Sequence, residues 1–328
     1  DLRRPVMSPT WRQRPQLLLL AMAVVMPLTF SVWNALLNNF AVEQIDFTGR
    51  EIGILQSLRE IPGFLSFTVV FLLLVLREQR LALIALALMA ASIGVTGYFP
   101  TILGLYITTV CMSLGFHYFE ALHESLTLQW LPKGETAHFM GQALAARAVA
   151  SLVAYGSIWL LMDQLGVSFQ DMYLLAGGIG LAIVVVIWLS FPVFPEQHMQ
   201  RKQIVLRRRY WLYYGLTFMS GARRQIFMVF AAFMMVEKFG FSVGQVSALY
   251  LVNYVFNLAF APRIGRWIGR VGERRALTIE YIGLFGVFAS YAFVSDAWIA
   301  AALFVIDHFF FAMAIAIKTY FQKIADPA

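Results

Sequence analysis

Apolar runs near 20 residues recur along the whole of this 328-residue chain and constrain its fold more than any other feature. A hydrocarbon core of roughly 30 Å takes about 20 helical residues to cross. Only 13% of the residues are charged, whereas a soluble domain carries about 25%, so a soluble helical core is excluded. We therefore expect an all-α polytopic membrane protein. Its expected spans are about 16–40, 52–76, 81–98, 101–130, 138–162, 170–193, 210–236, 243–262, 276–294 and 297–320.

Lysine and arginine concentrate in alternate connections between these spans. Arginines cluster at 207–209 and 263–275, whereas the opposite connections hold mainly acids such as Asp46 and Asp296. Because basic loops stay in the cytoplasm, we expect a cytoplasmic N-terminus in a multi-pass protein of the cell inner (plasma) membrane. Orientation thereby explains the net charge of +7, and no nucleic-acid partner is expected.

Two distant parts of the chain resemble each other at a nearly constant spacing. The outer loop that contains Val42, Glu43, Phe47, Thr48 and Glu51 matches, 194 residues later, Val236, Glu237, Phe241, Ser242 and Gln245. The next inner loop matches at a spacing of 195, where Glu78 and Arg80 correspond to Glu273 and Arg275. One offset over two loops on opposite membrane faces indicates two related halves.

The repeat predicts the domain organisation. Residues 1–194 are expected to form a six-helix bundle, 195–209 a basic cytoplasmic linker, and 210–328 the first four helices of a second bundle. An even number of helices per half gives both halves the same orientation. Partners of the fifth and sixth spans would fall beyond Ala328, so the expected native chain has two further helices and this copy is incomplete at its C-terminus.

The connection at 262–275, PRIGRWIGRVGERR, resembles the signature loop of the major facilitator superfamily. The residues that fit are Gly265, Arg270, Gly272, Arg274 and Arg275. Gly269 stands where the family usually has aspartate, and the first-half copy is reduced to Arg77-Glu78-Gln79-Arg80. The resemblance implies two six-helix bundles and secondary transport in a bacterial protein, with a loop that latches the inner gate. Orientation alone would also place arginines here.

Charged side chains inside the spans are candidates for function, because an ionised group at the centre of a membrane helix costs about 2.5–3.5 kcal/mol. His117, Glu120, His123 and Glu124 are spaced to share one stripe of the fourth span. Arg147 in the fifth span lies at a similar depth, so we predict an ion pair with Glu124 or Glu120. The remaining acid would couple protons; alternatively, both acids only hold the two helices together.

A second set of embedded residues lies in the later spans. Arg223, Arg224 and Gln225 fall near the middle of the seventh span, with Asp307 as the available acid. Two arginines and one acid leave one positive charge unpaired, which predicts that an arginine binds an anionic substrate. Alternatively, both arginines are paired with groups of the protein itself. Asp307 and His308 form a candidate proton-coupling pair, with a packing role for the histidine as the alternative.

Asparagines mark the expected walls of a substrate cavity. Asn34 and Asn38 share a face of the first span, and Asn253 and Asn257 share a face of the eighth. A buried amide needs hydrogen-bond partners, which substrate or water would supply, although amides also bridge helices. Together with His123, Arg147 and the residues around Arg224, they form the predicted substrate-binding set.

These observations favour a proton-coupled transporter that moves a small polar or anionic organic solute by alternating access. The alternative substrate is a transition metal or its chelate, held by the stripe of His117, Glu120, His123 and Glu124. A receptor or channel without coupled transport is the alternative of another class.

No enzyme motif, cofactor or resident metal site is expected. The single cysteine, Cys111, lies inside a span and gives neither a disulfide nor a thiolate site within the chain. The expected partners are the lipid bilayer, the solute and protons, and the expected state is a monomer.

Overall fold

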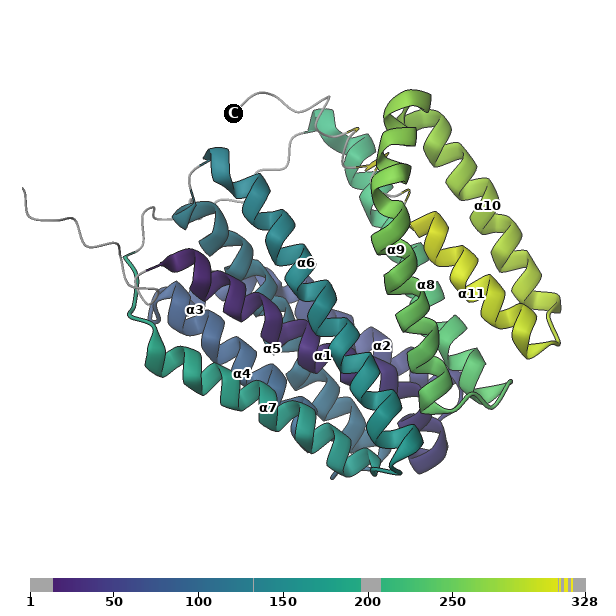
Figure 1. Cartoon of the computed structure of the whole chain (residues 1–328), viewed down its shortest axis with the longest axis horizontal. Coiled ribbons are helices and arrows are strands. Elements are labelled where there is room, and N and C mark those ends of the chain that lie inside the picture. The colour runs from purple at the N-terminus through teal and green to yellow at the C-terminus, as the bar shows by residue number, and fades with distance from the viewer. Residues whose placement is uncertain are drawn as a thin grey trace, which may run out of the picture. The chain divides into compact units, whose positions relative to one another are not determined.

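Helices account for every regular element that the computed structural model of this chain describes (Figure 1). The description covers residues 14–131, 133–195, 208–311, 313, 316–317 and 320. Within these ranges it leaves out the side chains of 133–138, 140–141, 223–228, 257–258, 261–262, 265 and 311. The chain divides into two compact units, Asp1–Lys202 and Gln203–Ala328, so the division falls within the range expected for the linker.

The N-terminal unit contains the helices that were expected as the first six spans. They are α1 (Pro15–Ile45), α2 (Gly49–Phe64), η2 (Leu65–Thr68), α3 (Val69–Leu72), α4 (Glu78–Thr96), α5 (Ile102–Trp130), α6 (Lys133–Ile158), the π-helical η3 (Trp159–Gln164) and α7 (Phe169–Ser190). The second expected span, 52–76, was predicted as one helix, and this prediction was wrong. It is divided into α2, the 3₁₀ segment η2 and the short α3, because Pro62 removes a helical hydrogen bond near the point of division.

The C-terminal unit holds the short η4 (Arg208–Tyr210) and four longer helices. These are α8 (Trp211–Glu237), α9 (Val243–Val271), α10 (Glu273–Phe293) and α11 (Ala297–Phe311). By length and composition, six helical segments of the described chain can cross a membrane: α1, α4, α5, Gln142–Gln164, α7 and α10. Shorter apolar stretches lie at Val243–Phe256 and Ala297–Phe310.

Glycines let the helices of the N-terminal unit approach closely around α4. A Cβ on Gly177 of α7 would lie 2.4 Å from the Cα of Gly94 on α4. A Cβ on Gly115 of α5 would lie 2.5 Å from the Ala85 carbonyl oxygen of α4. Membrane helices gain stability from such contacts, because lipid leaves little hydrophobic drive for association.

The internal repeat reappears in the way that α2 and α9 begin. Thr48 caps α2 in a capping box with Glu51, and Ser242 caps α9 in a capping box with Gln245. Each hydroxyl accepts a backbone N–H, while the residue three positions later accepts the N–H of the cap. The repeated sequence thus encodes the same helix start in both units.

The turns that precede these helices also match. Phe47 donates its N–H to the Ala41 carbonyl, and Phe241 donates to Met235, each over 3.0 Å. The turns pass through a left-handed residue, Asp46 with φ of 57° in one unit and Gly240 with φ of 65° in the other. After each helix, a left-handed residue is thus followed by a backbone hydrogen bond that spans six positions. This match confirms that the two stretches are structural equivalents.

The connection between α9 and α10 consists of one residue, Gly272. Its φ of 89° and ψ of 150° belong to a backbone region that is essentially restricted to glycine. An apolar cluster lies beside the turn; its buried members are Ile264, Ile268, Ala276, Met313 and Ala316. The glycine therefore lets two long helices reverse direction directly at this cluster.

Candidate functional site

The central polar network of the N-terminal unit joins α5 to α6. Arg147 of α6 forms an ion pair with Glu120 of α5, with 2.9 Å between Nη1 and Oε1. The other guanidinium nitrogen, Nη2, lies 3.4 Å from Nδ1 of His123. The predicted ion pair between Arg147 and Glu120 is confirmed. Arg147 thus bridges two titratable side chains that lie one turn apart on α5.

A third helix fixes the histidine ring in this network. Nε2 of His123 lies 2.9 Å from the Leu19 carbonyl of α1, which can only accept a hydrogen bond. Nε2 must therefore donate, which leaves Nδ1 to accept from Arg147. The ring in this arrangement carries one proton, on Nε2. The histidine is buried, whereas the side chains of Arg147 and Glu120 are 23% and 37% exposed.

The position of α6 explains why Glu120, rather than Glu124, is the partner. Helix α6 begins at Lys133 and not near 138, so Arg147 lies about 7.5 Å further along its helix than expected. Glu120 is four residues, about 6 Å, further from the end of α5 than Glu124. Glu124 is exposed and forms no ion pair with the residues that the structure describes.

His117 and His123 lie on different faces of α5, so the prediction of one common stripe was wrong. Residues six positions apart on a helix point about 120° apart. His117 packs against Gly63 of α2, where its ring would lie 2.8 Å from an added Cβ, whereas His123 faces α1. Within the described part of the chain, no three His, Cys, Asp or Glu side chains lie close enough to hold a metal ion.

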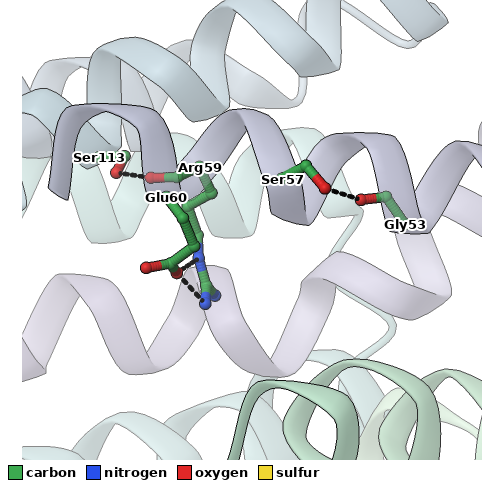
Figure 2. A network of polar contacts seen from close by, with 5 residues as sticks. All are labelled: Gly53, Ser57, Arg59, Glu60 and Ser113. Atoms are coloured by element: carbon green, nitrogen blue, oxygen red, sulfur yellow. Dashed lines mark hydrogen bonds and ion pairs between the residues drawn. The ribbon is translucent and has the colours of Figure 1, made fainter. Parts of the chain in front are cut away.

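The structure adds an embedded ion pair that sequence reasoning missed. Arg59 of α2 pairs with the neighbouring Glu60, with Nη2 2.8 Å and Nε 3.1 Å from the same carboxylate oxygen. Figure 2 shows both side chains projecting together from α2, while the Ser113 hydroxyl of α5 donates to the Arg59 carbonyl. Two adjacent charges inside the expected span 52–76 were the signal that would have identified them.

The predicted amides of α1 have different environments. Asn38 is buried, and its Oδ1 has no hydrogen-bond partner among the described residues, while Asn34 is half-buried. Nearby on the same helix, the Ser31 hydroxyl donates to Ser151 of α6 over 3.0 Å. On the polar face of α1, Ser31 therefore connects α1 to α6, whereas the Asn38 Oδ1 acceptor is unsatisfied among the described residues.

In the C-terminal unit, two buried acids lie on different helices. Asp307 of α11 and Glu280 of α10 are both fully buried, and Glu280 was missed from the sequence although it lies within an expected span. His308 donates through Nδ1 to the Phe304 carbonyl of its own helix over 3.0 Å. The proton-coupling role of Asp307 and His308 stays a prediction.

Asn253 of α9 is the most clearly unsatisfied amide. It is 2% exposed, and neither Nδ2 nor Oδ1 has a hydrogen-bond partner among the described residues. A buried amide without partners is energetically costly, so Asn253 stays a candidate for the predicted substrate-binding set. The side chains of Arg223, Arg224, Gln225 and Asn257 and the burial of Gly265 lie outside the description, so the predicted roles of these residues stay predictions.

The arginines of the signature loop are exposed. Arg270 lies in the last turn of α9, and Arg274 and Arg275 lie in the first turn of α10. Exposed arginines at this turn fit both a cytoplasmic anchor and a basic latch. The residue of this loop whose identity the backbone conformation restricts is Gly272, because its φ of 89° and ψ of 150° favour glycine.

Long apolar helices that hold ionised side chains among them are typical of multi-pass membrane proteins that move ions or solutes. The family model of the Major Facilitator Superfamily matches residues 18–328. The chain belongs to this superfamily. No curated protein sequence matches it.

Solved structures of the superfamily share the fold. A variant of the nucleoside transporter NupG superposes with a TM-score of 0.76 at 16% identity, over 96% of this chain and 84% of that chain. A bacterial homologue of the human lysosomal transporter Spinster, inward-facing and occupied, gives 0.69 at 13% identity, over 98% and 76%. At these identities the likeness extends to the fold alone.

Proposed function

We propose that this chain is a proton-coupled transporter of a small organic solute that carries an anionic group, working by alternating access. The observation that carries the proposal is the bridge that Arg147 makes between Glu120 and His123. The orientation of the basic loops supports a bacterial inner-membrane protein with a cytoplasmic N-terminus.

The network suggests how solute and proton are linked. A carboxylate or phosphate on the solute competes with Glu120 for the guanidinium, because arginine binds such groups in a fork. Glu120 then loses the charge that stabilises its ionised form and takes up a proton. The proton keeps the net charge of the loaded site equal to that of the empty site, whereas the solute alone would add one negative charge inside the membrane.

The hydrogen bond from His123 to Leu19 supports a positioning role for the histidine. It holds the ring so that Nδ1 faces Arg147 and no second proton is needed there. Replacing His123 by glutamine should weaken solute binding without removing its dependence on pH. This separates the positioning residue from Glu120, which carries the proton.

A second candidate solute is neutral and rich in hydrogen-bonding groups. The unsatisfied amides of Asn38 and Asn253 favour it, since a nucleoside-like molecule offers both donors and acceptors. The NupG structure is that of a nucleoside transporter. The metal alternative has lost its support, since His117 and His123 lie on different faces of α5.

Thermal unfolding of the purified protein with small carboxylates, organic phosphates and nucleosides at two pH values tests the proposal. A solute that binds the folded state raises the melting temperature. The anionic solute should stabilise the wild type and lose its effect in Arg147→Gln, while Glu124→Gln serves as the matched control. Stabilisation by nucleosides alone, unchanged in Arg147→Gln, would favour the second candidate and contradict the first.

A further inference from the structure

The break in α2 is held on both sides by two adjacent residues of α5. On one side, the imidazole of His117 fills the space beside Gly63, at 2.8 Å from where a Cβ would lie. On the other side, the hydroxyl of Tyr118 lies 2.5 Å from Oγ1 of Thr68 in η2. Thr68 donates its own proton to the Leu65 carbonyl over 2.6 Å. Tyr118 is therefore the donor in this contact.

The segment after the break is thinly packed. From residue 65 to residue 76, only Val69 is buried, whereas Phe67, Phe71 and Val75 are 48%, 64% and 86% exposed. The helix also tightens into 3₁₀ geometry over Leu65–Thr68 before it ends at Leu72. Within the N-terminal unit the segment thus has few buried contacts and irregular helical winding, two features of segments that open locally.

The far end of this segment is fixed. Gln79, the residue after the buried Glu78, donates to the Pro192 carbonyl over 2.9 Å and accepts from the Phe194 N–H over 2.8 Å. The reduced signature loop thus connects the start of α4 to the stretch that follows α7. Residues 65–76 form a weakly held strap between two anchored points.

We propose that residues 65–76 are a movable gate of the N-terminal unit, hinged at Pro62 and Gly63 and held by a catch between Tyr118 and Thr68. Helix α5 carries both this catch and, on the face turned toward α1 and α6, the network of Glu120, His123 and Arg147. A rotation of α5 that accompanies rearrangement of the network would also move Tyr118. The gate rests on the proposed function, because it needs the transport cycle to move α5.

Hydrogen–deuterium exchange of the purified wild-type protein and of Tyr118→Phe tests the catch. Loss of one hydrogen bond should raise the exchange rate of the peptide that covers 65–76 about three- to tenfold and leave α4 unchanged. Tyr98→Phe is the matched control, since Tyr98 is 48% exposed and lies outside the catch. Equal exchange in Tyr118→Phe and the wild type would overturn the proposal.

A compensating pair of substitutions tests the hinge. Gly63→Ala should displace the His117 ring and raise exchange at 65–76. Adding His117→Ala should restore it, because the shortened side chain leaves room for the new methyl group. If the double variant exchanges as fast as Gly63→Ala alone, the imidazole is not the contact that matters and the hinge is refuted.

Transport assays then separate a gate from a local packing feature. If the gate operates, Tyr118→Phe changes the turnover rate more than the solute concentration at half-saturation. Faster exchange with unaltered turnover would overturn the gate. The exchange measurement needs no substrate, so it tests the gate separately from the proposed function. Failure of the proposed function would appear as the absence of solute binding in the wild type.

Discussion

Two glycines three residues apart in the signature loop should respond to alanine with opposite signs. Gly272 has φ of 89° and ψ of 150°, and an added Cβ would meet no atom of the described residues within 4 Å. The cost of Gly272→Ala is therefore backbone strain alone, about 1–3 kcal/mol. Gly269 lies inside α9 and is equally open, so Gly269→Ala should stabilise the protein by about 0.5–1 kcal/mol.

Unfolding in detergent, followed by intrinsic fluorescence against denaturant, measures both variants. The Gly269 variant is the internal control, because it adds the same methyl group to the same loop. The two changes should be separated by about 1.5–4 kcal/mol in unfolding free energy. Equal shifts, or a more stable Gly272→Ala, would refute the assignment of this turn to a glycine-only conformation.

Three further predictions concern other parts of the N-terminal unit. Gly180→Val should lower the melting temperature, because even a Cβ would lie 2.4 Å from the Thr29 methyl group; no loss would mean that α7 is not packed closely on α1. Glu120→Leu should destabilise the protein by about 1–3 kcal/mol, which is less than the loss expected for a fully buried ion pair. In a double-mutant cycle, adding Arg147→Leu should recover most of this loss, because no unpaired charge is then left between the helices. The hydrogen bonds from Thr48 hold the pKa of Glu51 below its usual value, so this cap stabilises the fold at neutral pH and loses its effect as the pH falls through that lowered pKa. In Glu51→Gln the melting temperature should therefore fall less steeply with decreasing pH than in the wild type. An equally steep fall in both proteins would contradict this role of Glu51.

Features fixed by local sequence were predictable. The repeat reappeared as matched capping boxes at Thr48 and Ser242, because a hydroxyl followed three residues later by Glu or Gln specifies a helix start without help from distant residues. The ion pair of Arg147 was predictable for a similar reason, since depth along two adjacent helices limits the choice to two carboxylates.

Features that depend on packing between helices were not predictable. His117 and His123 were predicted to share one stripe because sequence spacing gives only the approximate direction of a side chain around its helix. It does not say which neighbouring helix the side chain contacts. In the structure the two histidines contact different helices, since His117 packs against α2 and His123 lies at α1. The break after Pro62 was hidden in a long apolar run, where membrane helices often tolerate proline.

The coupling of proton and solute at Arg147 is tested most directly by counting protons on binding. An anionic solute that stabilises the protein is added in weakly buffered solution, and the pH change is followed with a dye. The wild type should take up protons as the solute displaces Glu120 from Arg147, and Glu120→Gln should bind the solute with less uptake. Equal uptake by the two proteins would contradict the role given to Glu120.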